Sequence, residues 1–128
     1  MSAISNYLED ALLKLVFKST AFSSPGTTHL ALYSSNPADD DSGTEISGGS
    51  YARQSIPWGA YTNGTGSLTT NDDINFTNMP AVTVSHVAIF DAATGGNMLW
   101  YGALTSSKSV NSGDTFAITS GNLTVTLD

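Results

Sequence analysis

The sequence predicts a mainly β protein, an antiparallel β-sandwich or jelly-roll-like fold with one N-terminal α-helix. Three observations lead to this prediction. Serine, threonine, asparagine and glycine are common while lysine and glutamate are scarce, which favours strands and turns over helices. One segment near the start repeats apolar residues at helical spacing. Beyond it, short alternating apolar and polar segments are separated by turns rich in glycine and asparagine.

The helical segment lies within residues 1–20. Ser2 or Ser5 is the expected N-cap, because a serine hydroxyl can accept a hydrogen bond from the first helical N–H groups. The helix is expected to end between Phe17 and Thr20, before a Ser-Ser-Pro-Gly turn. Its apolar residues share one face, which we expect to contact either the body of the protein or a partner. These residues are Ile4, Tyr7, Leu8, Ala11, Leu12 and Leu15.

We expect one domain over residues 1–128, with an N-terminal helix or arm at 1–20 and a β-rich body at 27–128. The predicted strands of the body have period-two patterns and lie at residues 28–33, 51–56, 67–70, 74–76, 82–90 and 98–104. Pro57 predicts that the second of them is an edge strand or ends there.

The pattern also predicts which residues of one strand share a face and how the last two strands pair. The strand at residues 82–90 is predicted to place alternate residues on one face: Val82, Val84, His86, Ala88 and Phe90. Segments 115–119 and 123–127 flank a Ser-Gly-Asn turn, so they are predicted to pair with each other as a final hairpin.

The charge of the chain excludes several function classes. Four Lys and Arg residues stand against eleven Asp and Glu, a formal net charge of −7. Binding to DNA or RNA requires several cations on phosphates, and binding to anionic lipid has the same requirement, so neither is expected. The absence of cysteine removes thiolate catalysis and disulfides. The sequence contains no apolar run of bilayer length and no basic leader, so we expect synthesis in the cytoplasm.

Candidate metal ligands are few. Asp39, Asp40 and Asp41 are an acidic run of the kind that can hold a hard cation such as calcium, but the spacing departs from that of an EF-hand, and a solvated loop is the expected structure. His29 and His86 are the only histidines, and each is expected to pack within a sheet. No metal or other cofactor is therefore predicted.

No catalytic residues are predicted either. Ser85, His86 and Asp91 have the residue types of a hydrolase triad, but neighbouring strand residues point to opposite faces, so Ser85 and His86 are not expected to interact. Four aromatic residues are candidates for a sugar- or partner-binding shelf, although packing against a sheet is the expected role of most. They are Trp58, Tyr61, Trp100 and Tyr101, of which the last two must face opposite sides.

Five phrases follow one another in fixed order along the chain. They are Tyr-Leu-Glu-Asp-Ala-Leu-Leu at 7–13, Ala-Leu-Tyr-Ser-Ser-Asn-Pro at 31–37, Gly-Gly-Ser-Tyr-Ala-Arg-Gln at 48–54, Gly-Gly-Asn-Met-Leu-Trp-Tyr-Gly-Ala-Leu at 95–104 and Leu-Thr-Val-Thr-Leu at 123–127. This order resembles a family of small virion proteins of tailed bacteriophages, which are described as structural, capsid decoration (cement) or tail-fibre proteins. The resemblance implies no catalytic residue. The three aspartates, Pro57 and Trp58 lie outside its pattern.

The resemblance implies a non-enzymatic virion structural protein made in the host cytoplasm. We expect a capsid decoration protein that binds the outer surface of the major capsid shell and stabilises it. Its expected partners are the major capsid protein and copies of itself, in a dimer or trimer. The alternative is a tail or tail-fibre component with a receptor- or glycan-binding role.

Overall fold

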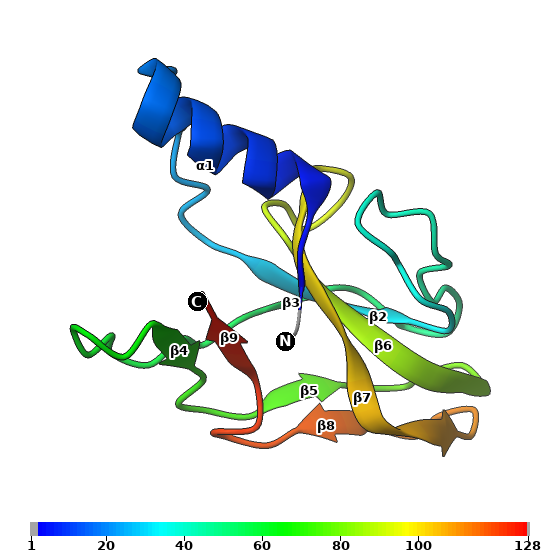
Figure 1. The fold of residues 1–128 in the computed structure, drawn as a ribbon. Helices are drawn as coiled ribbons and strands as arrows, with labels where there is room; N and C mark the ends of the chain where they lie inside the picture. Colours follow the sequence, from blue (N-terminus) through cyan, green and yellow to red (C-terminus); the bar gives the residue numbers. More distant parts are fainter. Residues whose placement is uncertain (1–2, 128) are drawn as a thin grey trace.

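A computed structural model describes residues 3–127 (Figure 1). The elements, in chain order, are β1 (Ala3–Ile4), α1 (Asn6–Lys18), β2 (His29–Tyr33), β3 (Gln54–Ser55), β4 (Ser67–Thr69), β5 (Ile74–Phe76), β6 (Val82–Phe90), β7 (Met98–Val110), β8 (Phe116–Ile118) and β9 (Thr124–Thr126). One sheet has the order β1-β7-β6-β2-β3, and two smaller sheets pair β4 with β9 and β5 with β8. All pairs are antiparallel, and the predicted fold class is confirmed: mainly β, consistent with a sandwich, with one N-terminal helix.

Helix α1 begins at a serine cap that also fastens it to the large sheet. The hydroxyl of Ser5 accepts a hydrogen bond from the Leu8 N–H at 3.2 Å and donates one to the Met98 carbonyl of β7 at 2.5 Å. The helix ends at Lys18, and Ser19 adopts a left-handed φ of 55°. Both ends agree with the sequence prediction, except that the alternative cap Ser2 lies outside the described residues.

Strand β2 is covered on both sides. Leu30 and Leu32 point into the main core, whereas Ala31 and Tyr33 belong to a second cluster on the opposite face of the sheet. This alternation follows from the two-residue period of a strand. The strand at Gln54–Ser55 is shorter than predicted, and it lies at the edge of the sheet, as Pro57 indicates.

The predicted continuous face of β6 is wrong. The register between β6 and β7 shifts between Val84 and His86. A β-bulge changes which residues of a strand share a face. As a result Val87 and Ile89 join the main core beyond the bulge, and Ala88 and Phe90 lie in the second cluster.

The predicted C-terminal hairpin is also wrong. β8 pairs with β5, where Phe116 lies opposite Phe76, and β9 pairs with β4. The turn between β8 and β9 is present, but the backbone of Thr70 holds it: the Thr70 N–H donates to the Leu123 carbonyl, and the Gly121 N–H donates to the Thr70 carbonyl. These bonds direct the two strands to different partners.

Candidate functional site

The predicted apolar face of α1 lies largely against the body. Leu8 is buried, and Ala11 and Leu12 are half-buried and pack on the main core. Ile4 belongs to β1 and packs on the same core. At the margin, Tyr7 and Leu15 remain 41% and 40% exposed. Whether the exposed part of this face contacts a partner stays a prediction.

A second apolar surface on α1 is exposed. Leu13, Val16 and Phe17 are 57%, 66% and 75% exposed, and their spacing of three and four residues places them side by side. We call these three residues the apolar helix stripe. Figure 1 shows that the C-terminal half of α1 projects beyond the sheets. A helix that is apolar on most of its sides is normally buried against other protein.

The sequence contains the signal for this stripe. Residues 11–17 include one polar side chain, that of Lys14, so no helical register could place all the apolar residues on one face. The sequence prediction assigned the apolar residues of the helix to one face, and it therefore left out Leu13, Val16 and Phe17, which are exposed in the structure.

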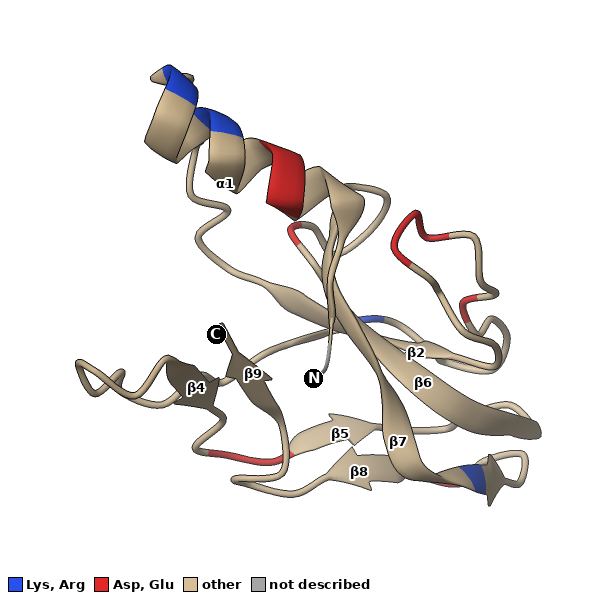
Figure 2. Ribbon diagram, in the orientation of Figure 1, with Lys and Arg blue, Asp and Glu red and all other residues tan. Residues whose placement is uncertain are grey.

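Charge is unevenly distributed along the helix. Glu9 and Asp10 lie in its first half, whereas Lys14 and Lys18 lie toward its projecting end (Figure 2). Asp10 and Lys14 approach to 3.9 Å as an exposed pair. Half of the basic residues of an acidic protein thus flank the apolar helix stripe.

On the body, Arg53 joins three loops. Its guanidinium binds both carboxylate oxygens of Glu45, at 3.0 and 2.8 Å, and donates to the carbonyls of Ala92 and Gly95, at 3.1 and 2.8 Å. The same group lies 3.7 Å above the centre of the Phe90 ring. Arg53 thus connects the loops at Glu45 and at Ala92 and Gly95 beside the end of β6.

Two tyrosines extend this network. The Tyr51 hydroxyl donates to Glu45 at 2.7 Å and accepts from the Leu32 N–H at 3.0 Å, and the Tyr33 hydroxyl donates to Asp41. Burial raises the pKa of both phenols well above the usual 10.0, and the neighbouring carboxylates raise it further. Both hydroxyls are therefore protonated donors in neutral solution.

The three aspartates of the acidic run have separate partners. Asp39 accepts from the hydroxyl of Tyr101, Asp40 accepts from the Ser42 N–H, and Asp41 accepts from Tyr33. The bond to Asp39 also raises the pKa of Tyr101. Within residues 3–127, no group of three or more His, Asp or Glu side chains is placed to hold a metal ion.

The prediction that Ser85 and His86 do not interact is wrong. Their side chains are hydrogen-bonded, with Oγ and Nδ1 2.8 Å apart, because the bulge beside them breaks the strict alternation of the strand. Asp91 does not complete a triad: its carboxylate accepts from the backbone and side-chain amides of Asn97, at 2.7 and 3.0 Å. The histidines are separated too, since His29 lies opposite Phe90 and His86 opposite Tyr33 at the other end of β2.

The four candidate aromatic residues do not form one shelf. Trp58 donates to the Thr28 hydroxyl at 2.9 Å, and Tyr101 packs in the second cluster. Trp100 packs on the main core, so Trp100 and Tyr101 do face opposite sides. Tyr61 is exposed and shares an apolar groove of about 560 Å³ with Trp100 and Leu127.

Among the described residues, no helix has the length and hydropathy needed to cross a bilayer. The described surface offers an apolar helix stripe, a cluster of loops joined at Arg53 and open grooves, and surfaces of this kind are suited to binding.

The comparison with protein families shows which family the chain belongs to. The family described as podophage GP4 fiber I protein gp80 matches residues 3–126, so the chain belongs to this family. No match is found among curated proteins. The resemblance to small phage virion proteins is confirmed, and the chain is a structural protein of a bacteriophage virion.

Proposed function

We propose that the protein is a subunit of a fibre-type appendage of a podophage virion, attached to a neighbouring virion protein through the apolar helix stripe. The match to a fibre protein family over nearly the whole chain is the observation that carries this proposal. The function needs no catalytic step, in keeping with a family of structural proteins.

The exposed side chains of the stripe supply the attachment energy. Full burial of a Leu, Val or Phe side chain contributes about 1.5–3 kcal/mol. Leu13, Val16 and Phe17 are more than half exposed, so they have most of this energy left to contribute in a complex. Lys14 and Lys18 beside them favour a partner surface whose rim carries acidic residues.

Capsid decoration is the second candidate. In its favour, the described residues form a body of short strands, with no repeated segment that would build a shaft. A protein that binds the outer surface of the assembled major capsid shell, and not its free subunits, stabilises the shell by mass action. The net charge of −7 suits this outer location, because it disfavours contact with packaged DNA. Assembly into a dimer or trimer belongs to the same proposal.

The copy number in purified particles separates the two candidates. Quantitative mass spectrometry would compare this chain with the major capsid protein of the same particles. A fibre subunit is expected in far fewer copies than the capsid protein, and labelled antibodies should mark the tail. Copies comparable with the capsid protein, spread over the shell, would favour decoration. Complete absence from the particles would contradict both candidates.

A further inference from the structure

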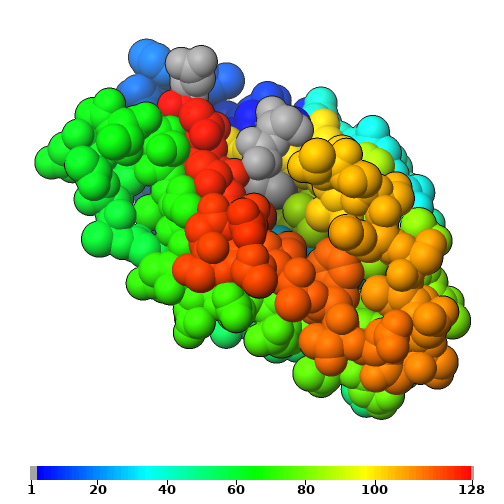
Figure 3. Space-filling view, turned by 90° about the horizontal axis from the view of Figure 1, so that it is seen from below, coloured from blue at the N-terminus to red at the C-terminus, as the bar shows by residue number. Residues whose placement is uncertain are grey.

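The strands β7 and β8 diverge to form an open cleft. They follow each other through residues 111–115, yet β7 pairs with β6 while β8 pairs with β5. The space between them, closed at one end by β9, has a volume of about 490 Å³. Figure 3 shows this hollow between the orange atoms of β7 and the red-orange atoms of the β8–β9 region. Binding sites for small ligands have volumes of this order.

The floor of the cleft is apolar and fixed. Val87, Phe116 and Leu123 line it, and each is also a buried member of the main core. Phe116 packs edge-on against Phe76 with ring centres 6.2 Å apart, which holds its ring in place.

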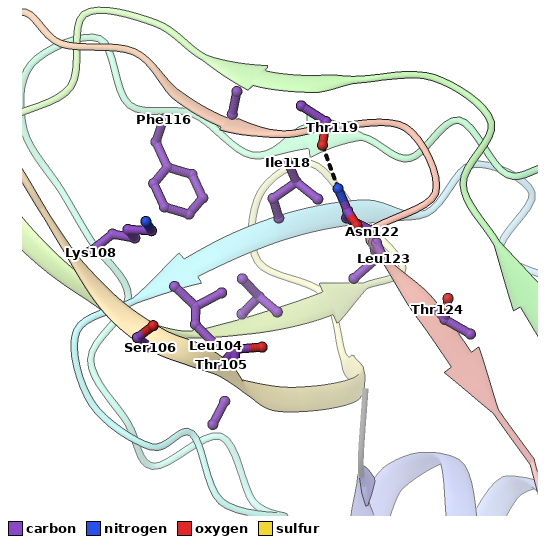
Figure 4. Close-up of a pocket in the computed structure, with 13 residues that line it drawn as sticks. Leu104, Thr105, Ser106, Lys108, Phe116, Ile118, Thr119, Asn122, Leu123 and Thr124 are labelled. Carbon is purple, nitrogen blue, oxygen red and sulfur yellow. Dashed lines mark hydrogen bonds between the residues drawn. The ribbon is translucent and has the colours of Figure 1, made fainter.

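The walls are polar. Thr105, Ser106 and Lys108 project from β7, and Thr119 and Asn122 lie on the opposite side (Figure 4). The Asn122 amide donates to the Thr119 hydroxyl, which orients it and leaves its second N–H and its carbonyl oxygen for a ligand. Figure 4 shows the Lys108 side chain directed toward the Phe116 ring.

We propose that this cleft binds a saccharide, with an acidic sugar residue at Lys108. A sugar ring has an apolar C–H face that fits the apolar floor. Its hydroxyl groups donate and accept hydrogen bonds, as the side chains of Thr105, Ser106 and Asn122 do. The ammonium group of Lys108 has hydrogen-bond donors only, and Lys108 is the one cationic side chain among the described residues that line the cleft, so it matches a sugar carboxylate.

Other ligand classes fit less well. A nucleotide or polyphosphate requires several cations or a loop of backbone N–H groups around its phosphates, and the cleft lining contains one lysine. A lipid chain requires apolar walls, whereas those here carry hydroxyl and amide groups. An extended peptide along the free edges of β7 and β8 is the competing occupant, and the experiment below includes it.

The test uses the full chain on an array of immobilised neutral and uronic-acid-containing oligosaccharides, with calorimetry on those bound, and a library of extended peptides as the competing probe. The wild-type protein should bind acidic saccharides. Ser106→Trp fills the cleft and should abolish binding, whereas Ser109→Trp, on the same strand but outside the lining, should bind as the wild type does.

Lys108→Gln should weaken binding of the acidic saccharide about tenfold, as expected for loss of one hydrogen bond to a charged group. Lys18→Gln on the helix removes the same charge outside the cleft and should have no effect. A wild-type protein that binds no saccharide, that binds only peptides, or whose binding survives Ser106→Trp would overturn the proposal. The site is independent of virion attachment, so normal incorporation of Ser106→Trp into particles would leave the proposed function intact.

Discussion

The guanidinium of Arg53 and the carboxylate of Glu45 form a two-point contact, Nε to Oε2 at 3.0 Å and Nη2 to Oε1 at 2.8 Å. The Arg53 side chain is 9% exposed and the Glu45 side chain is 27% exposed, so the ion pair is largely removed from water. Because Arg53 also binds two carbonyls of the loop after β6, this contact holds loops from three parts of the chain in one arrangement.

Replacement of Arg53 by lysine should therefore be costly. Lysine keeps the charge but loses the planar two-point contact and the position over Phe90, and we expect a loss of about 2–3 kcal/mol in the free energy of unfolding. Urea denaturation would measure it. Lys14→Gln removes an exposed ion pair and should change stability by less than about 0.5 kcal/mol. Equal effects of the two substitutions would contradict the role given to Arg53.

The two buried phenols predict a stability loss in alkali. In the unfolded chain Tyr33 and Tyr51 ionise near the usual pKa of 10.0, whereas in the folded protein the pKa of each is raised. Below pH 10 both states are protonated and the full stability is present. As the pH rises above 10 the unfolded state loses protons first, so the free energy of unfolding should fall. Urea denaturation between pH 8 and 11 would measure this, and a smaller slope is expected for the Tyr33→Phe, Tyr51→Phe double variant. A slope unchanged by the double substitution would argue against burial of these hydroxyls.

The two sides of α1 should respond differently to truncation. Leu8→Ala should cost about 2–4 kcal/mol, because it leaves a cavity between the helix and the core. Val16→Ala should change stability by no more than about 0.5 kcal/mol, since Val16 touches mainly solvent in the isolated chain. Thermal unfolding monitored by circular dichroism would compare them. If Val16→Ala lowered the stability as much as Leu8→Ala does, the apolar helix stripe would have to pack against the body of the same chain, which would contradict the account.

The cap at Ser5 carries two hydrogen bonds at once. Ser5→Ala removes the acceptor for the Leu8 N–H and the donor to the Met98 carbonyl, and both partners lie in a buried setting. We expect a loss of about 1–2 kcal/mol in the free energy of unfolding. Ser5→Thr retains the hydroxyl and serves as the control. Chemical denaturation would measure the free energy of unfolding of both variants. Equal stability of Ser5→Ala and the wild type would contradict the claim that the Ser5 hydroxyl makes both stabilising hydrogen bonds.

Local patterns predicted the elements better than their partners. The helical period, the Ser5 cap and the alternation of β2 depend on neighbouring residues, and these features agree with the structure. The hairpin around Gly121 failed because a distant residue, Thr70, holds the turn and sends β8 and β9 to other strands. The spacing of residues along the sequence does not reveal a contact between Thr70 and a turn about fifty residues away.

The irregular pairing between β6 and β7 had a similar effect at the candidate site. Because the register shifts between Val84 and His86, Val87 lies in the main core and Ala88 lies on the opposite face of the sheet, which is the reverse of the prediction. The side chains of Ser85 and His86 are hydrogen-bonded at the same place. Alternation alone could not reveal this shift, since neither residues 84–86 nor the facing residues 103–108 contain a glycine or proline. The apolar helix stripe was different: its residues were visible in the sequence, and only the position of the body showed which of them remain exposed.

The central claim is that the apolar helix stripe attaches the protein to the virion. The most direct measurement is the amount of each variant that co-sediments with phage particles when it is supplied in place of the wild type. The triple variant Leu13→Ser, Val16→Ser, Phe17→Ser should fold and remain in the supernatant. The control Tyr61→Ser, Leu127→Ser removes exposed apolar side chains away from the helix and should sediment with the particles. Incorporation of the triple variant at the wild-type level would contradict the account.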